Sequence, residues 1–230
     1  MKKWKINKFA IATFIAVLFH VSGFIGMFTI KYSWFVANTS LNLLIMLALI
    51  FWTHTGKNAA FFAFVFICFV TGMLTEIIGV NTSLLFGKYE YGKVLGTGIM
   101  NVPWIIGVNW FTVMYCSGVA TAHLHRRIES GSATAESFLT PKIRLLSFII
   151  DGALLATFFD YILEPVAVKL GYWKWIGSGN IPFSNYLCWF LISCLLLTVF
   201  KLLSFPKHNQ FAVHLLIIEL LFFGALRTFL

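Results

Sequence analysis

The chain has 230 residues, of which 60% are hydrophobic and only 11% are charged, and its formal net charge is +9. A soluble domain carries about a quarter charged residues, so this composition excludes a soluble domain, a disordered chain, a nucleic-acid-binding module and a disulfide-stapled secreted fold. Excess Lys and Arg is instead typical of helix ends that face anionic lipid. The sequence therefore predicts an integral membrane protein with lipid as its surroundings and no nucleic-acid partner.

Seven apolar runs are long enough to cross a bilayer, since one helical crossing needs about 20 residues. They cover residues 9–30, 34–53, 59–80, 100–122, 144–165, 185–205 and 211–229. The connections on the N-terminal side of the membrane hold 11 Lys and Arg against 6 on the other side, which places the N-terminus inside and the C-terminus outside. We expect one all-α, polytopic transmembrane domain over residues 1–230.

Three connections between the runs differ in character. The connection 123–142 is polar and basic and is expected to be a solvated loop on the inside. The connections 81–99 and 167–184 are rich in aromatic residues and glycine, and the topology places both on the outer side.

Five of the eight acidic residues lie inside or at the ends of the apolar runs. Each costs about 2–3 kcal/mol at bilayer depth, so intramembrane acids are functional candidates by default. We therefore take the following as candidate catalytic residues: Glu76, Asp151, Asp160 and Glu164. Glu219, in the last run, is predicted to be a structural group or a proton relay, buried against His214 or His20.

Helix geometry predicts that three of these acids meet. A rise of 1.5 Å per residue places Glu76 and Asp160 each about 25 Å from the inner end of its segment, and Glu164 lies on the same helix face as Asp160. Asp151 is nine residues from Asp160, on the opposite face, and is expected to contact a different neighbour. Pro165 should disfavour helix at Glu164 and free a carbonyl near Tyr161.

Crowded carboxyl groups in a medium of low dielectric cannot all ionise, so one should keep its proton near neutral pH. A protonated carboxyl beside an ionised one is a general acid beside a general base. The alternative is that the acids form ion pairs that anchor the loops, with partners among Lys88, Lys93, Lys169 and Lys174.

Aromatic and amide side chains gather at the same membrane side as these acids. Rings around a proton donor suit a cationic intermediate, although Trp and Tyr also serve as ordinary interfacial anchors. The predicted substrate-binding residues are Tyr89, Tyr91, Trp104, Trp110, Tyr172, Trp173, Trp175, Asn185 and Trp189.

The sequence has no P-loop, no dinucleotide-binding glycine motif, no histidine box, and no lysine in its last segment that could form a Schiff base with retinal. No metal and no cofactor are expected. Acids, water and aromatic rings without a cofactor indicate protonation of an alkene and capture of the resulting carbocation, on an apolar substrate that enters from the bilayer.

Several motifs together resemble the membrane carotenoid 1,2-hydratase family, which includes bisanhydrobacterioruberin hydratases of archaea and γ-carotene 1'-hydroxylases of bacteria. The motifs are Glu76-Ile-Ile-Gly79-Val80, Phe86-Gly87-Lys88-Tyr89-Glu90-Tyr91, Val102-Pro103, Asp151-Gly152, Asp160, Glu164-Pro165-Val166-Ala167, Gly171-Tyr172-Trp173-Lys174-Trp175, and Ile181-Pro182 with Asn185 and Trp189. The resemblance implies a carotenoid substrate, a bacterial or archaeal cell membrane, and cofactor-free addition of water across the terminal C1=C2 bond of an acyclic end group.

One of Glu76, Asp160 and Glu164 would then protonate C2, and a second would deprotonate the attacking water. Two alternatives remain open at this point. A carotenoid cyclase begins with the same protonation, and a proton-coupled or ion-coupled transporter also uses intramembrane acids.

Overall fold

The computed structural model describes residues 7–131, 140–177 and 179–230. Within these residues most of the chain is helical. The helices are α1 (Lys8–Met27), α2 (Tyr32–Ala37), α3 (Thr39–Thr53), α4 (Ala59–Thr82), α5 (Ile105–Gly131), α6 (Pro141–Lys169), α7 (Phe183–Leu202) and α8 (Gln210–Phe229). The predicted all-α fold is confirmed.

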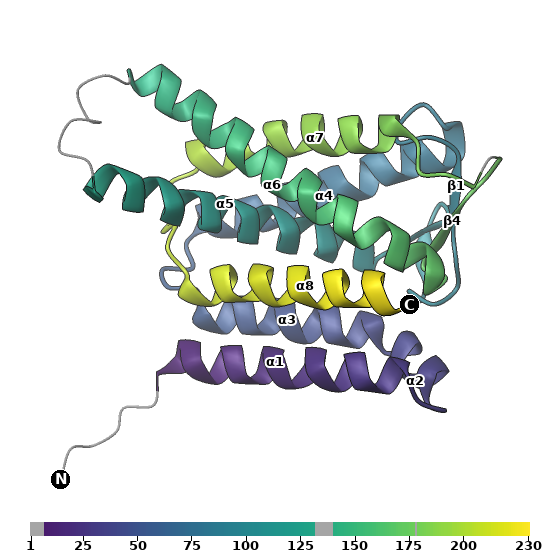
Figure 1. The fold of residues 1–230 in the computed structure, drawn as a ribbon. Coiled ribbons are helices and arrows are strands. Elements are labelled where there is room, and N and C mark those ends of the chain that lie inside the picture. The colour runs from purple at the N-terminus through teal and green to yellow at the C-terminus, as the bar shows by residue number, and fades with distance from the viewer. Residues whose placement is uncertain (1–6, 132–139, 178) are drawn as a thin grey trace, which may run out of the picture.

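The long helices lie side by side as a bundle and alternate in direction (Figure 1). Helices α1, α4, α6 and α8 run toward the end of the bundle that carries the strands, and α3, α5 and α7 run back. Within the described part of the chain, six helices are long and apolar enough to cross a membrane: α1, α4, α5, α6, α7 and α8. The chain is therefore a polytopic membrane protein whose α8 ends at the opposite end of the bundle from the start of α1.

The predicted single helix over 34–53 is interrupted, and this expectation was wrong. Asn38 separates α2 from the 15-residue α3, and its side-chain amide donates to the Trp34 carbonyl at 2.8 Å. An asparagine that bonds to local backbone competes with helix continuation. The second segment is consequently a short turn of helix followed by a short apolar helix.

The helices that run toward the strands begin with side-chain caps. Asn7, Asn58, Thr140 and Asn209 each accept a hydrogen bond from a backbone N–H of the first helical turn. These caps satisfy donors that a helix start leaves free. They fix where α1, α4, α6 and α8 begin.

Helix α5 occupies the centre of the bundle. In its apolar span 78% of the residues are buried, against 22–33% in the other five spans. It starts at Ile105 rather than near residue 100, because residues before it form the hairpin of β2 (Gly98–Ile99) and β3 (Val102–Pro103). It also continues to Gly131, so the connection expected from residue 123 is helical up to that glycine, and residues 132–139 of it lie outside the described residues.

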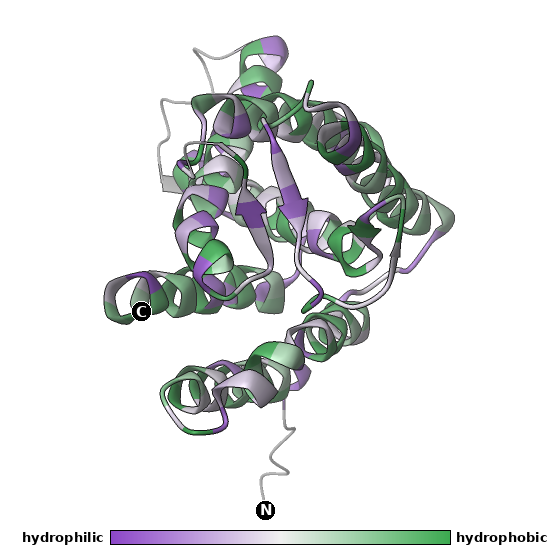
Figure 2. Ribbon diagram, turned by 90° about the vertical axis from the view of Figure 1, so that its right-hand side faces the viewer, coloured by the Kyte–Doolittle hydropathy of each residue, from purple (hydrophilic) through white to green (hydrophobic). Residues whose placement is uncertain are grey.

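The two aromatic connections pair with each other. Strand β1 (Tyr89–Tyr91) runs antiparallel to β4 (Trp173–Trp175), with Tyr89 opposite Trp175 and Tyr91 opposite Trp173. Figure 2 looks onto this end of the bundle and shows hydrophilic strands lying across the ends of mostly hydrophobic helices. The prediction that both connections share one membrane side is confirmed.

Pro165 lies inside α6, which continues for four residues beyond it to Lys169. The expected loss of helix at Glu164 was therefore wrong, whereas the expected free carbonyl is present. The Tyr161 carbonyl, four residues before the proline, accepts a hydrogen bond from Arg227 Nη1 at 2.8 Å. An arginine of α8 thus replaces the backbone donor that proline lacks.

Candidate active site

Three buried carboxyl groups line one small cavity beneath the β1–β4 pair. Glu76 comes from α4, and Asp160 and Glu164 come from successive turns of α6. The predicted convergence of these three acids is confirmed. The other residues that line this acid cavity are Phe86, Tyr89, Tyr91, Ile106, Asn109, Trp110, Trp173, Trp175, Asn185 and Trp189.

Glu76 accepts hydrogen bonds on both carboxyl oxygens. Tyr89 and Tyr91 donate their hydroxyl groups to Oε2 at 2.5 and 2.8 Å, and Trp110 Nε1 donates to Oε1 at 3.0 Å. Glycines four residues before and three after Glu76 make room for these partners. A Cβ at Gly72 would lie 2.5 Å from Trp110, and one at Gly79 would lie 2.8 Å from the Tyr89 hydroxyl.

Glu164 has a comparable set of donors from the other aromatic strand. Trp173 and Trp175 donate their indole N–H groups to Oε2 at 3.1 and 3.0 Å. Asn185 Nδ2 donates to Glu164 Oε1 at 3.3 Å and to Asp160 Oδ2 at 2.8 Å. One amide of α7 therefore bridges the two carboxyls of α6.

Asp160 differs from the other two acids. Its Oδ2 accepts from Asn185, but its buried Oδ1 has no hydrogen-bond partner among the residues the structure describes. Buried polar atoms are normally paired, so an unpaired one needs a reason. Asp160 Oδ1 is a free oxygen beside the acid cavity.

The alternation of side chains along the two strands explains this arrangement. In a strand, successive side chains point to opposite faces, so the tyrosines of β1 and the tryptophans of β4 face the carboxyls. The middle residues, Glu90 and Lys174, face outward as an exposed ion pair at 2.5 Å. The alternative in which the three acids pair with loop lysines is wrong for the described residues, because their partners are phenols, indoles and an amide.

The two phenols remain donors over the ordinary pH range. Burial, followed by the charge of the neighbouring Glu76, raises the pKa of Tyr89 and of Tyr91 above the usual phenol value of 10.0. Both hydroxyls therefore stay protonated and keep bonding to Glu76.

A second and larger cavity adjoins the acid cavity. It has a volume of about 410 Å³ and lies among α1, α2, α3, α5, α6 and α8, where its apolar lining includes Phe19, Trp34, Phe159 and Phe222. The two cavities share Ile106, Asn109 and Trp173. An apolar chain in the large cavity would therefore have its end next to the carboxyls. The sequence motifs left open whether the first, second and last segments hold a substrate, because apolar residues in a membrane helix carry no signal of what they face.

Two predicted aromatic residues lie apart from the carboxyls. Tyr172 lines the large cavity and its hydroxyl bonds to Thr39 Oγ1 at 2.7 Å. Trp104 is 46% exposed and lines neither cavity. The other predicted aromatic residues and Asn185 all line the acid cavity.

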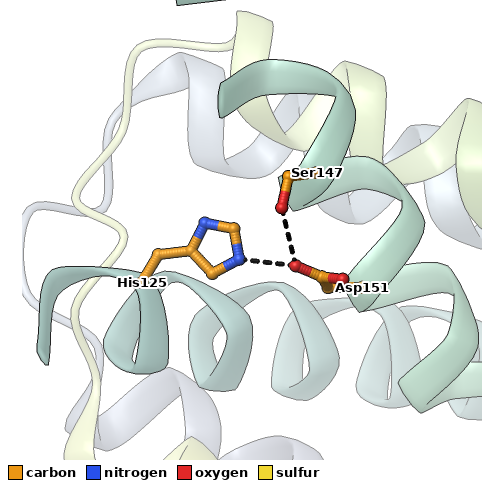
Figure 3. Close-up of polar contacts among 3 residues, drawn as sticks. All are labelled: His125, Ser147 and Asp151. Carbon is orange, nitrogen blue, oxygen red and sulfur yellow. Dashed lines mark hydrogen bonds and ion pairs between the residues drawn. The ribbon is translucent and has the colours of Figure 1, made fainter. Parts of the chain in front are cut away.

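Asp151 also lies apart, as its helix face indicated. Its Oδ2 bonds to His125 Nε2 at 2.8 Å and to Ser147 Oγ at 2.9 Å, and its side chain is 47% exposed (Figure 3). It lines neither cavity. The structure therefore gives Asp151 a contact between α5 and α6 and does not bring it to the other three acids.

Glu219 forms no pair with a histidine within the described residues, so that expectation was wrong. His214 Nδ1 bonds to Thr13 Oγ1, and His20 Nδ1 bonds to the Ala16 carbonyl. Glu219 and His20 instead both line the large cavity. Among the described residues no group of three His, Cys, Asp or Glu side chains has a geometry suited to a metal ion.

Comparison with known proteins gives two matches. The family model described as "Carotenoid biosynthesis protein" matches residues 34–229. The bisanhydrobacterioruberin hydratase of Haloarcula japonica is 29% identical over 119 residues, which is 50% of this chain and 36% of that protein. The match thus spans about a third of the relative's length. No solved structure matches the chain. Both matches agree with the resemblance carried by the motifs.

Proposed function

The chain belongs to the carotenoid biosynthesis protein family, and from this premise we propose that it adds water to the terminal C1=C2 double bond of an acyclic carotenoid end group. The observation that carries the proposal is the acid cavity, where three carboxyls and a wall of aromatic rings adjoin a large apolar cavity. The hydratase name of the relative supports the same reaction.

The hydrogen-bond pattern supports Asp160 as the general acid. Glu76 and Glu164 each accept three hydrogen bonds from neutral donors, a pattern that favours the ionised form of a carboxyl. Asp160 accepts only one and has a free oxygen. We assign the transferable proton to Asp160 Oδ1 and the base to Glu164, which is joined to Asp160 through Asn185.

The reaction balances without a redox partner. The π electrons of the alkene form a C2–H bond with the proton of Asp160, whose O–H bond breaks, and a tertiary cation forms at C1. A water oxygen then bonds to C1, and the excess proton of that water passes to a carboxylate. The net change is the addition of one water molecule.

The aromatic rings stabilise the cation. Trp110 and Trp189 stack beside the carboxyls, and Trp173 belongs to both cavities. A desolvated ring face attracts a cation by about 1–2 kcal/mol. The indole and phenol donors hold the carboxyls in place, so the rings serve both the acids and the intermediate.

The experiment is expression of the chain, and of its variants, in cells that accumulate an acyclic carotenoid. Hydration gives a product heavier by one water, whereas a cyclase gives a ring with unchanged mass. Asp160→Asn and Glu164→Gln should each lower hydration by about 10²-fold or more, the usual contribution of a general acid or base. Glu76→Gln should also lower hydration, because it removes a negative charge that lines the acid cavity beside the cation. Asp151→Asn is the comparison on the same helix and should retain activity. Full hydration by both Asp160→Asn and Glu76→Gln would refute the proposal.

Proton uptake tests the transporter alternative. Proteoliposomes that contain the protein and no carotenoid should show no proton uptake beyond that of protein-free vesicles. Uptake that Asp160→Asn abolishes would favour a transporter.

A further inference from the structure

Asn109 lies on the boundary between the two cavities. Asn109 is one of the residues that line both the large apolar cavity and the acid cavity, together with Ile106 and Trp173. It comes from α5, one residue before Trp110, which donates to Glu76. Unlike the amide of Asn185, the amide of Asn109 takes part in no hydrogen bond with any described residue.

The acid cavity has the size of one water molecule. Its volume is about 20 Å³, and a cavity needs roughly 10–15 Å³ to hold a water, together with two or more polar partners. Asn109 and Asp160 both line this cavity. Asp160 Oδ1 and the Asn109 amide have no hydrogen-bond partner among the described residues. One water in this cavity can bond to the Asn109 amide, and it can donate to Asp160 Oδ1 once Asp160 has given its proton to C2.

We propose that Asn109 binds the attacking water at the boundary of the two cavities and so directs the carbocation to hydration. The inference rests on the proposed hydration and adds to it the residue that holds water, the second substrate of that reaction. Asn109 is a positioning residue for the water and takes no proton itself.

An amide suits this task chemically. Its oxygen accepts one proton of the water and its N–H donates to the water oxygen, and because it is neutral it does not compete with the carboxyls for the transferred proton. Because Asn109 lies where the apolar cavity meets the acid cavity, the bound water lies next to the end group of the substrate and not beside the middle of its polyene chain.

The proposal predicts what happens when the water is lost. In the variant Asn109→Leu, Asp160 still transfers a proton to C2, so the C1 cation still forms. Without a positioned water, the cation loses a proton from C2 or from a C1 methyl group to the carboxylate. Loss from C2 restores the C1=C2 alkene and loss from the methyl group gives an alkene between C1 and that carbon, and in both cases no water is added.

Deuterium uptake separates the two steps. Purified protein in proteoliposomes is given lycopene in D₂O, and the masses of hydrated and unhydrated carotenoid are measured. We expect Asn109→Leu to lower hydration tenfold or more while the unhydrated lycopene still gains deuterium. Asn109→Ser, which keeps a donor and an acceptor, should recover part of the hydration. Asp160→Asn should lose hydration and deuterium uptake together.

Three outcomes would overturn the proposal. Hydration by Asn109→Leu at the wild-type rate would show that Asn109 does not hold the water. Loss of both hydration and deuterium uptake in a folded Asn109→Leu protein would place Asn109 in proton transfer or in the structure. Absence of hydration by the wild-type protein would refute the proposed function itself, and the inference with it.

Discussion

The indole rings of Trp110 and Trp189 stack face to face, with ring centroids 4.0 Å apart and planes 10° from parallel. Trp110 comes from the central helix α5 and Trp189 from α7, so the stack joins two helices at the level of the acids. The same Trp110 donates its indole N–H to Glu76 at 3.0 Å. One side chain therefore fixes both the position of a carboxyl and part of the aromatic wall.

Trp110→Phe separates these two tasks, because phenylalanine keeps a ring against Trp189 but cannot donate to Glu76. A hydrogen bond to a charged group contributes about 1.5–3 kcal/mol, so we expect hydration to fall about 10- to 100-fold. The measurement is the rate of product formation in proteoliposomes.

Trp52→Phe is the matched control, since Trp52 lies on α3, is 46% exposed and lines neither cavity. It should change the rate by less than about twofold, as is usual for surface substitutions. Equal activity of Trp110→Phe and wild type would show that Glu76 does not need this donor.

Arg227 and Pro165 should be energetically coupled through the Tyr161 carbonyl. Arg227→Met leaves that carbonyl without its donor and should cost about 1–3 kcal/mol of stability. Pro165→Ala restores a backbone N–H that can bond to the same carbonyl. Arg227→Met should therefore lower the unfolding free energy much less in the Pro165→Ala background than in the wild-type protein.

A double-mutant cycle of unfolding free energies in detergent measures this coupling. The guanidinium also lies over the Tyr161 ring, 4.4 Å from its centroid, so part of the cost of Arg227→Met will persist in the Pro165→Ala background. Strictly additive effects of the two substitutions would contradict the assignment of Arg227 to the freed carbonyl.

The meeting of the acids was predictable because helix geometry is regular. The positions of Glu76 and Asp160 along their segments predicted that both lie at the same depth in the bilayer. The spacing of Asp160 and Glu164 predicted that both lie on the same face of one helix. The pairing of the two aromatic connections was not predictable, since strand pairing depends on contacts between distant parts of the chain. The donors to Glu76 and Glu164 follow from that pairing.

The break at Asn38 and the continuation of α6 through Pro165 were missed for a different reason. Each depends on one hydrogen bond to a carbonyl, from the Asn38 amide in the first case and from Arg227 in the second. The local sequence predicts that such a carbonyl lacks its helical partner, as Pro165 does for Tyr161. It does not predict which side chain donates a hydrogen bond to that carbonyl. The large cavity was missed because it arises from the packing of helices that are far apart in the sequence.

Glu219 should destabilise the protein in the absence of substrate. It is buried in the middle of α8, lines the large cavity, and has no hydrogen bond to any described residue. An intramembrane acid costs about 2–3 kcal/mol on insertion scales, so Glu219→Leu should raise the unfolding free energy by about 1–3 kcal/mol. Chemical unfolding in detergent micelles checks this.

Glu219→Gln is the comparison, because it replaces the ionisable carboxyl with a neutral but polar amide. It should raise the unfolding free energy less than Glu219→Leu does. A loss of stability in Glu219→Leu would mean that the carboxyl has a stabilising role in the folded protein.

His54 should make stability depend on pH between about 4 and 6.5. It follows the last residue of α3, stacks on Phe61 at 4.0 Å and bonds through Nδ1 to the Tyr115 hydroxyl at 2.7 Å. Burial, with smaller contributions from Lys57 and Lys8, lowers the pKa of His54 from 6.5 to about 4. In this pH range the unfolded chain binds a proton that the folded chain does not, so stability falls as the pH drops from 6.5 toward 4. Above 6.5 the histidine is neutral in both states and contributes no slope, and below 4 it is charged in both. His54→Phe keeps the aromatic contact with Phe61 and removes the titration, so the difference between its stability curve and that of the wild type should slope only inside this window. Thermal unfolding midpoints measured across the window give both curves, and a difference that stays flat through it would contradict the buried neutral state of His54.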